Sequence, residues 1–82
     1  MRVNACRMDM RKLVGDNVKN ARIAAGMTQE ELAERSGFSQ QYISGVECGR
    51  RNPTIVSIYE LAQALGISHE ALIKSNANDS QN

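Results

Sequence analysis

Apolar residues recur along this chain at spacings of three and four, which is the period of an amphipathic α-helix. The first such segment is predicted to begin near Asp9, whose carboxylate suits the positive end of a helix dipole, and to end at Gly26. The side chains expected to face the core from this helix are Val14, Val18, Ala21 and Ala25.

A second helix is predicted over residues 28–36. Thr28 is followed three residues later by Glu31, the capping-box pattern in which each side chain bonds a backbone N–H at the helix start. Leu32 and Ala33 are expected to face inward, whereas the charged residues around them stay in water.

A third helix is predicted after a tight turn at Gly37, because glycine reaches positive φ without a steric penalty. Ser39 is expected to cap this helix over residues 39–47, with Ile43 and Val46 on its buried side. Two short helices that cross at close range form either a simple αα-hairpin or a helix-turn-helix, and the apolar residues fit both.

The solvent side of the third helix bears on this choice. Gln40, Gln41 and Ser44 lie there, close to the amino end of the helix. A glutamine side chain donates and accepts hydrogen bonds at once, which matches N6 and N7 of adenine in the major groove. This chemistry favours contacts with DNA bases, although the residues by themselves leave the simple hairpin open.

Two further helices complete an all-α, five-helix domain. The fourth is predicted to follow Thr54 as its cap and to end at Gly66, and Ser68 is expected to cap a last helix over residues 69–75. The fourth helix carries a predicted buried stripe of Ile55, Ile58, Leu61, Ala62 and Leu65, and the last helix carries Leu72 and Ile73.

Residues 9–75 are therefore assigned to one small domain, which suits a chain of 82 residues with 41% hydrophobic residues and no tryptophan. Residues 1–8 lack helical periodicity and are predicted to be a flexible arm. Its Arg2 and Arg7 either reach into a DNA groove or belong to an unstructured leader. The polar tail, residues 76–82, is predicted to be disordered.

No apolar run approaches the roughly 20 residues that cross a membrane, and no signal peptide is evident, so a cytoplasmic location is expected. Cys6 and Cys48 lack metal-ligand spacing, and a disulfide is not expected in the reducing cytosol. Cys48 is either a spectator thiol or an oxidisable switch. His69 has no potential metal-binding partner nearby in sequence, so no metal, cofactor or small-molecule ligand is predicted, and no catalytic pairing suggests an enzyme.

The net charge of +1 is unevenly distributed. Residues 1–26 hold six basic and two acidic side chains, a net +4, whereas residues 53–82 carry a net −2. Phosphate binding depends on charge clustered on one face rather than on the total. Arg50, Arg51 and Asn52 follow the third helix and are expected to contact the sugar-phosphate backbone, which sets register without reading sequence.

The stretch over residues 28–47 resembles the helix-turn-helix of the lambda-repressor-like family, also called the Cro/CI-type or XRE family. The likeness extends over about residues 14–73 and includes the first-helix positions Val18, Arg22 and Gly26. It also includes the runs E-C-G-R-R-N-P-T at residues 47–54 and L-A-Q-A-L-G-I-S at residues 61–68.

The resemblance implies a sequence-specific transcriptional regulator of double-stranded DNA, either a repressor or an autoregulator. Its third helix is expected to enter the major groove while the second lies across the backbone. Gln40 and Gln41 match two base-reading glutamines of the family. A third reader falls on Gly45, so Ser44 and Tyr42 are expected to take over, with Tyr42 more suited to phosphate.

Further roles follow from the same resemblance. Gln29 at the start of the second helix and Ser39 at the start of the third are expected to lie at phosphates. Arg22 is expected to pair with Glu47 and so to join the first helix to the third as a structural ion pair.

A homodimer reading a palindrome is expected, with half-sites about 34 Å apart, because one such domain covers little DNA. Leu72 and Ile73 are adjacent and cannot both face one core, so one of them, together with Ile67, is expected to meet its twin across a twofold axis. The alternative is a protein-interaction module, such as an antitoxin that binds a toxin protein. The paired glutamines and the paired arginines weigh against it.

Overall fold

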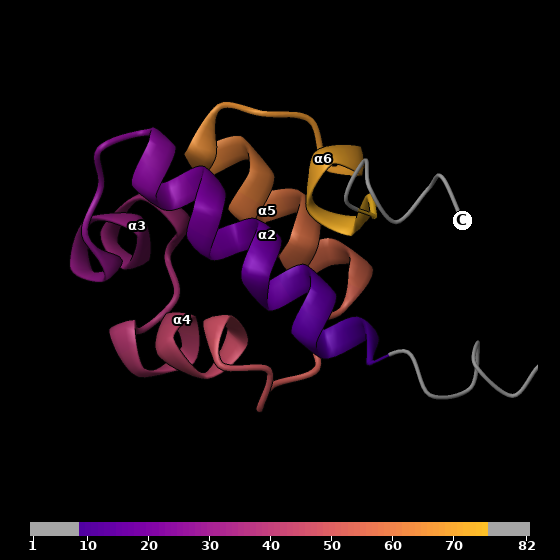
Figure 1. The fold of residues 1–82 in the computed structure, drawn as a ribbon. Helices are drawn as coiled ribbons and strands as arrows, with labels where there is room; N and C mark the ends of the chain where they lie inside the picture. Colours follow the sequence, from indigo (N-terminus) through magenta and orange to yellow (C-terminus); the bar gives the residue numbers. More distant parts are fainter. Residues whose placement is uncertain (1–8, 76–82) are drawn as a thin grey trace, which may run out of the picture.

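The computed structural model describes residues 9–75, and every regular element in this range is a helix (Figure 1). This confirms the all-α, five-helix prediction. The helices are α2 (Met10–Ala24), α3 (Gln29–Ser36), α4 (Gln40–Glu47), α5 (Ile55–Leu65) and α6 (Glu70–Ile73). The predicted arm, residues 1–8, and the predicted tail, residues 76–82, lie outside the described residues.

Side-chain caps fix where four of these helices begin. The Thr28 hydroxyl accepts the N–H of Glu31 at 3.0 Å, and the Glu31 carboxylate accepts the N–H of Thr28 at 2.9 Å, which is the predicted capping box of α3. Asp9, Ser39 and Thr54 each accept a backbone N–H at the start of α2, α4 and α5. A cap of this kind typically stabilises a helix by about 1 kcal/mol.

The core is aliphatic and lies where α2 crosses the other helices (Figure 1). α2 packs against α4 and α6, and α3 packs against α4 and α5. Each of the five helices supplies at least one fully buried side chain, and burial of one such side chain contributes about 1.5–3 kcal/mol. These side chains are Val18, Leu32, Ile43, Val46, Leu61 and Leu72.

The backbones of α2 and α4 come into contact at Gly15, which is buried in α2. A Cβ atom at this position would overlap the carbonyl oxygen of Val46 and lie 3.0 Å from that of Glu47. Glycine therefore lets the carboxyl end of α4 lie directly against α2, and this contact helps to set the position of α4 on the domain.

Two predicted core positions prove to be exposed. Ala25 caps the carboxyl end of α2 and faces solvent. Ile55 is the first residue of α5 and has 82% of its surface exposed, because it lies beyond the buried stripe of that helix. The stripe consists of Leu61, Ala62 and Leu65, with Ile58 partly buried against it.

The last helix is shorter than predicted and is not capped by the Ser68 hydroxyl. Its N-cap residue is His69, which makes no side-chain capping bond. The backbone carbonyl of Ser68 instead accepts the N–H of Ala71, and that of His69 accepts the N–H of Leu72, both at 3.0 Å. These bonds span three residues, so the segment begins as a tight turn rather than a capped α-helix.

The structure separates the roles of two adjacent apolar residues in α6. Leu72 is fully buried, whereas Ile73 is 43% exposed, so Ile73 is the outward residue. Asn17 of α2 holds this arrangement, because its side-chain amide donates to the carbonyl oxygens of Leu72 and Lys74, both at 2.9 Å.

Replacement of Gly15 by alanine is expected to destabilise the fold by about 1–3 kcal/mol, as overpacking of a close contact does, despite alanine's higher helix propensity. Gly45→Ala is the matched control. A Cβ at this second helical glycine would lie 2.7 Å from Cγ of Arg51, so the exposed Arg51 side chain has to shift but no backbone atom does, and the loss there should be smaller. Urea unfolding of both variants measures the difference, and an unchanged free energy of unfolding for Gly15→Ala would contradict the role given to this contact.

Candidate nucleic-acid interface

The turn between α3 and α4 fixes the angle between the two helices. Gly37 adopts the left-handed conformation with φ 85°, and its N–H bonds the carbonyl of Ala33 at 2.9 Å. Phe38 follows and is partly buried, with its ring centroid 4.7 Å from that of Tyr42. The turn is therefore held by a hydrogen bond to α3 and by a ring contact with α4, and these two contacts fix the direction of α4 relative to α3.

The carboxylate of Glu47 holds the other end of α4. Its side chain is only 3% exposed, and it accepts hydrogen bonds from Arg22 Nε at 2.7 Å and Arg22 Nη2 at 3.1 Å. The remaining Nη1 of Arg22 donates to the carbonyl oxygen of Met27 at 2.8 Å. This bidentate ion pair joins α2 to α4. Both side chains are largely buried, so water could not solvate one charge if the other were removed.

A chain of hydrogen bonds runs from this ion pair to the start of α4. Gln29 Nε2 donates to Glu47 Oε1 at 3.0 Å, and Gln40 Nε2 donates to Gln29 Oε1 at 2.8 Å. Gln29 was predicted only as a phosphate contact. Nothing in the sequence indicates this link, because Gln29, Gln40 and Glu47 are brought together only by the crossing of α3 and α4. The side-chain amide of Gln40 is thus oriented by its hydrogen bond to Gln29, which is itself bonded to the buried Glu47.

The predicted reading face of α4 is accessible in part. Gln40 and Gln41 are exposed at its amino end, and Ser44 is partly buried one turn later. Ser39 uses its hydroxyl oxygen to accept the N–H of Tyr42 at 3.0 Å, which leaves the hydroxyl proton free to donate.

The loop after α4 folds back along this helix. The carbonyl oxygen of Gly45 accepts the N–H groups of Arg50 at 2.8 Å and Arg51 at 3.2 Å. The side chain of Arg51 then lies where a side chain at residue 45 would project, and its guanidinium carbon is 5.6 Å from the centre of the Tyr42 ring. Gly45, where the resemblance places a third reader, is buried, so this helix offers no side chain of its own there.

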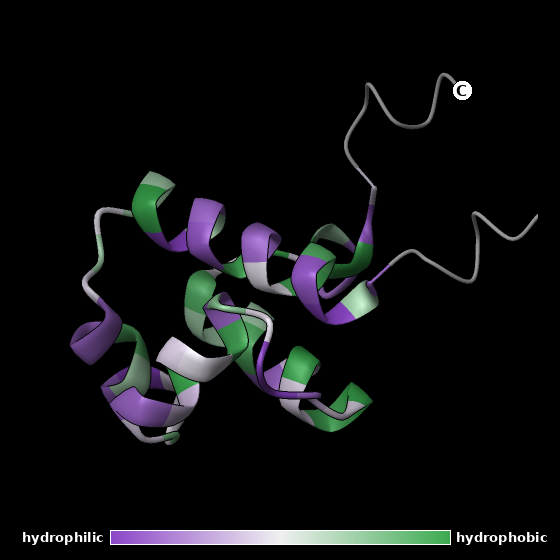
Figure 2. Cartoon of the chain, turned by 60° about the horizontal axis from the view of Figure 1, so that its bottom comes forward, coloured by the Kyte–Doolittle hydropathy of each residue, from purple (hydrophilic) through white to green (hydrophobic). Residues whose placement is uncertain are grey.

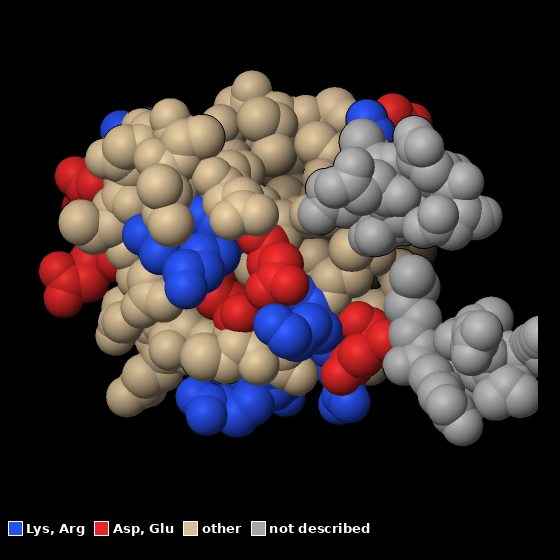
Figure 3. Space-filling model, viewed as in Figure 1, with Lys and Arg blue, Asp and Glu red and all other residues tan. Residues whose placement is uncertain are grey.

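Basic groups gather at the edge of the molecule below α4 and its following loop (Figure 3). Arg50, Arg51 and Asn52 are all exposed in this loop. Within residues 9–75, neither arginine takes part in an ion pair. These two charges are consequently available to an anion such as phosphate.

The positive charge on α2 is partly neutralised by its own acidic residues. Lys12 Nζ lies 3.3 Å from Asp16, and Arg11 Nε lies 3.4 Å from Asp9. Loss of solvent raises the pKa of the Asp9 carboxyl, but hydrogen bonds from Arg11 and its charge outweigh this effect, so the pKa lies below its usual value. Arg22 is paired with Glu47, so Lys19 is the one basic residue within 9–26 that takes part in no ion pair, and little free positive charge is left on α2 for phosphate.

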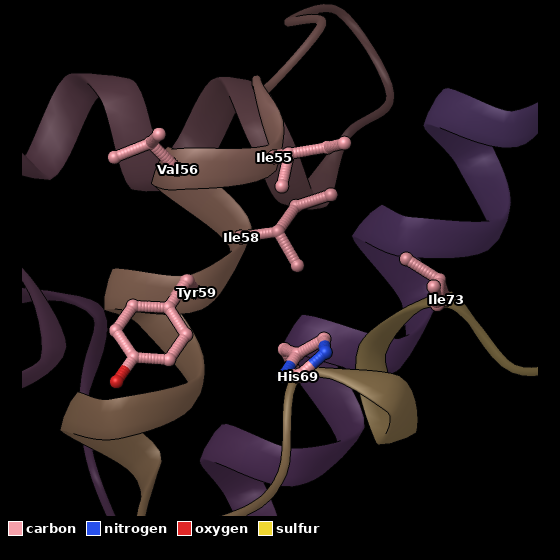
Figure 4. A pocket seen from close by; sticks show the side chains of 6 residues that line it. All are labelled: Ile55, Val56, Ile58, Tyr59, His69 and Ile73. Atoms are coloured by element: carbon pink, nitrogen blue, oxygen red, sulfur yellow. The ribbon is translucent and has the colours of Figure 1, made fainter.

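A second surface, the apolar groove, lies between α5 and α6 (Figure 4). The start of α5, which lines this groove, is hydrophobic, whereas the loop between α4 and α5 is hydrophilic (Figure 2). Of the residues in this groove, only Ile73 was predicted from the sequence to lie at a contact surface, although consecutive apolar residues at the start of α5 indicate that one of them faces outward. Its lining residues are Ile55, Val56, Ile58, Tyr59, His69 and Ile73.

The three residues predicted to form a dimer surface have different positions. Ile73 lines the apolar groove, Ile67 is partly buried against the core, and Leu72 is fully buried and is therefore corrected to a core residue.

Over residues 9–75 the structure brings together no group of three or more His, Cys, Asp or Glu side chains suited to a metal ion. In the same range no helix is long and apolar enough to cross a membrane. Cys48 is exposed at the carboxyl end of α4. Cys6 lies outside the described residues.

Comparison with known proteins adds an independent finding. The sequence model of the helix-turn-helix family HTH_3 matches residues 18–72. The uncharacterised HTH-type transcriptional regulator y4dJ of Sinorhizobium fredii is 64% identical over 66 residues, which cover 80% of this chain and 86% of the relative.

Solved structures share the fold as well. The hypothetical transcription factor NHTF from Neisseria superposes with a TM-score of 0.82 at 32% identity, covering 89% of this chain and 84% of that one. The restriction-modification controller protein C.AhdI from Aeromonas hydrophila superposes with a TM-score of 0.74 at 40% identity, covering 76% of this chain and 94% of that one.

Removal of one partner of the buried ion pair is expected to be costly. Arg22→Met leaves the Glu47 carboxylate buried without its cation and should lower the free energy of unfolding by about 3–5 kcal/mol. Adding Glu47→Leu should recover part of this loss, because no charge is then left buried. The measurement is a double-mutant cycle by urea unfolding.

The exposed pair Lys12–Asp16 serves as the matched control. Lys12→Met should cost less than about 1 kcal/mol, as solvent-exposed pairs do. Strict additivity of the Arg22 and Glu47 variants would show that the buried pair does not act as a unit.

Proposed function

Because this chain belongs to the HTH_3 helix-turn-helix family of DNA-binding transcriptional regulators, we propose that it binds a palindromic operator as a homodimeric repressor or autoregulator. Membership confirms the resemblance predicted from the sequence, and the relatives are regulators rather than enzymes. In the proposed complex α4 enters the major groove of each half-site and α3 lies across the backbone. The observation that carries the proposal is the orientation of the Gln40 amide at the exposed start of α4.

The hydrogen-bonding pattern of Gln40 favours adenine as its target base. Glu47 can only accept, so Gln29 must turn its NH₂ toward Glu47 and its oxygen toward Gln40. Gln40 then uses one N–H on Gln29 and keeps one N–H and its oxygen for a ligand. This remaining donor and acceptor complement N7 and N6 of adenine. Gln41 and Ser44 are proposed as neighbouring readers on the same face.

The proposed phosphate contacts surround this face. The N–H groups of Gln29 and Glu30 in the first turn of α3 are positioned for one phosphate, since the Thr28 cap occupies the N–H of Glu31. The Ser39 hydroxyl keeps its proton for a second contact. In the loop after α4 the contacts would come from Arg50, Arg51 and Asn52, with Tyr42 beneath Arg51.

The apolar groove is the proposed homodimer surface, in place of the predicted patch that included Leu72. Ile55 is 82% exposed, Val56 65% and Ile73 43%, so α5 and α6 leave apolar side chains together in water at this groove, as a protein interaction surface does. A twofold contact places the same face on both copies and so presents two α4 helices to one palindrome. The proposed partner of the groove is therefore a second copy of this chain.

Selection from a pool of random duplexes at about 150 mM salt tests the proposal as a whole. A palindromic motif with half-sites about 34 Å apart is the expected result. Weak binding that enriches no motif and disappears as salt rises would mean phosphate attraction alone. It would favour a protein partner, as in the antitoxin-like alternative.

On the selected operator, Gln40→Ala is expected to weaken binding by about 1–3 kcal/mol and to remove the preference at one base pair per half-site. Arg50→Ala is the control, because loss of a phosphate contact should weaken binding to all sequences alike and make its salt dependence shallower. Dissociation constants for the operator and its single-base variants measure both. A uniform loss for Gln40→Ala would instead make this residue a backbone contact.

Ile73→Asp is expected to convert the dimer to a monomer, because it places a charge in the apolar groove. Ile23→Asp is the matched control: Ile23 is 57% exposed on α2 and does not line the groove, so the dimer should persist. Sedimentation equilibrium measures both variants. A dimer that survives Ile73→Asp would place the interface elsewhere.

A further inference from the structure

One of the residues that line the apolar groove is a histidine. His69 stands at the start of α6, and its side chain lies among those of Ile58, Tyr59 and Ile73 (Figure 4). The centroid of its ring is 6.1 Å from that of Tyr59. The other five lining residues are aliphatic side chains and one tyrosine.

The charged residues around His69 do not offset a positive charge on its imidazole. Within residues 9–75, no carboxylate lies within ion-pair distance of the imidazole. Glu70, which follows His69 in the chain, and Lys74, which follows Ile73, are exposed residues of opposite sign. From α2, Arg11 lines the adjoining hollow beside Ile73, and from α5, Glu60 lines a separate hollow together with Arg35.

Dimerisation through this groove would take the imidazole out of water and place it against apolar side chains. A neutral imidazole tolerates such burial far better than an imidazolium, whose unpaired charge is costly in an apolar contact. Histidine is the side chain whose ordinary charge change falls between about pH 5 and 8. A twofold dimer buries two of these imidazoles, so protonation of either one would disfavour association.

We propose that the homodimer requires neutral His69, so that acidification dissociates the dimer and with it the bound operator. This inference rests on the proposed function, because it presumes dimerisation through the apolar groove. The sign follows from proton linkage: a group that must be neutral in the dimer releases its proton on association, so association weakens as pH falls. Each such group weakens it by as much as about tenfold per pH unit once histidine is mostly protonated.

Sedimentation equilibrium of the full chain at about pH 8 and about pH 5.5, at constant ionic strength, tests the inference. The dimer dissociation constant is expected to rise at least about tenfold at the lower pH. His69→Gln should remain dimeric with nearly equal dissociation constants at both pH values, and His69→Phe should do the same with an apolar ring. Circular dichroism of the Ile73→Asp variant at both pH values reports whether the protomer stays folded.

Each outcome separates the two proposals. No dimer at about pH 8 would overturn the proposed homodimer and the inference that depends on it. A dimer with equal dissociation constants at both pH values would overturn only the role of His69. The same rise in the dissociation constant for His69→Gln, or unfolding of the protomer at the lower pH, would assign the pH effect to other groups and would overturn the inference as well.

Discussion

The buried carboxylate of Glu47 is the interaction on which the placement of α4 depends. It is held by Arg22 of α2 and by Gln29 of α3, so a single side chain ties three helices together. A buried charge of this kind contributes little net stability, because desolvation offsets much of the attraction. Its value here is geometric: few arrangements of the three helices satisfy every donor and acceptor at once.

The same network connects the core with the surface that is proposed to read DNA. Gly15 lets the carboxyl end of α4 contact α2, and Glu47 at that end accepts hydrogen bonds from α2 and α3. Gln29, which donates to Glu47, in turn accepts a hydrogen bond from the Gln40 amide. The amide of Gln40 is therefore pre-organised before any base is present, which reduces the entropy lost on binding. Stability and the proposed recognition of DNA would thus depend partly on the same side chains.

The two proposed interaction surfaces differ in their physical character. The face built on α3, α4 and the loop after α4 is polar, with the exposed Arg50 and Arg51 beside it. The groove between α5 and α6 is apolar. α2 contacts both parts of the fold, since it packs against α4 through Gly15 and against α6 through Asn17. In the proposed dimer, α2 would therefore connect the groove that contacts the second copy with the α4 helix of the same copy.

The sequence by itself determined the features that are local. The caps at Thr28, Ser39 and Thr54 and the glycine turn at Gly37 depend on residues within four positions of one another, and all are found where the sequence predicts them. Resemblance to a family supplied the pairing of Arg22 with Glu47, which no spacing indicates.

Only the tertiary structure decided which apolar side chains are covered and which polar groups meet. α5 carries apolar residues on more than one side of its first turn, so periodicity could not tell that Ile55 and Val56 are exposed whereas Ile58 is partly buried. The sequence likewise does not decide which of Leu72 and Ile73 is buried, because this depends on how α6 packs against α2. Helical spacing specifies which residues share a face, whereas the face that is buried is set by neighbouring helices that are distant in sequence.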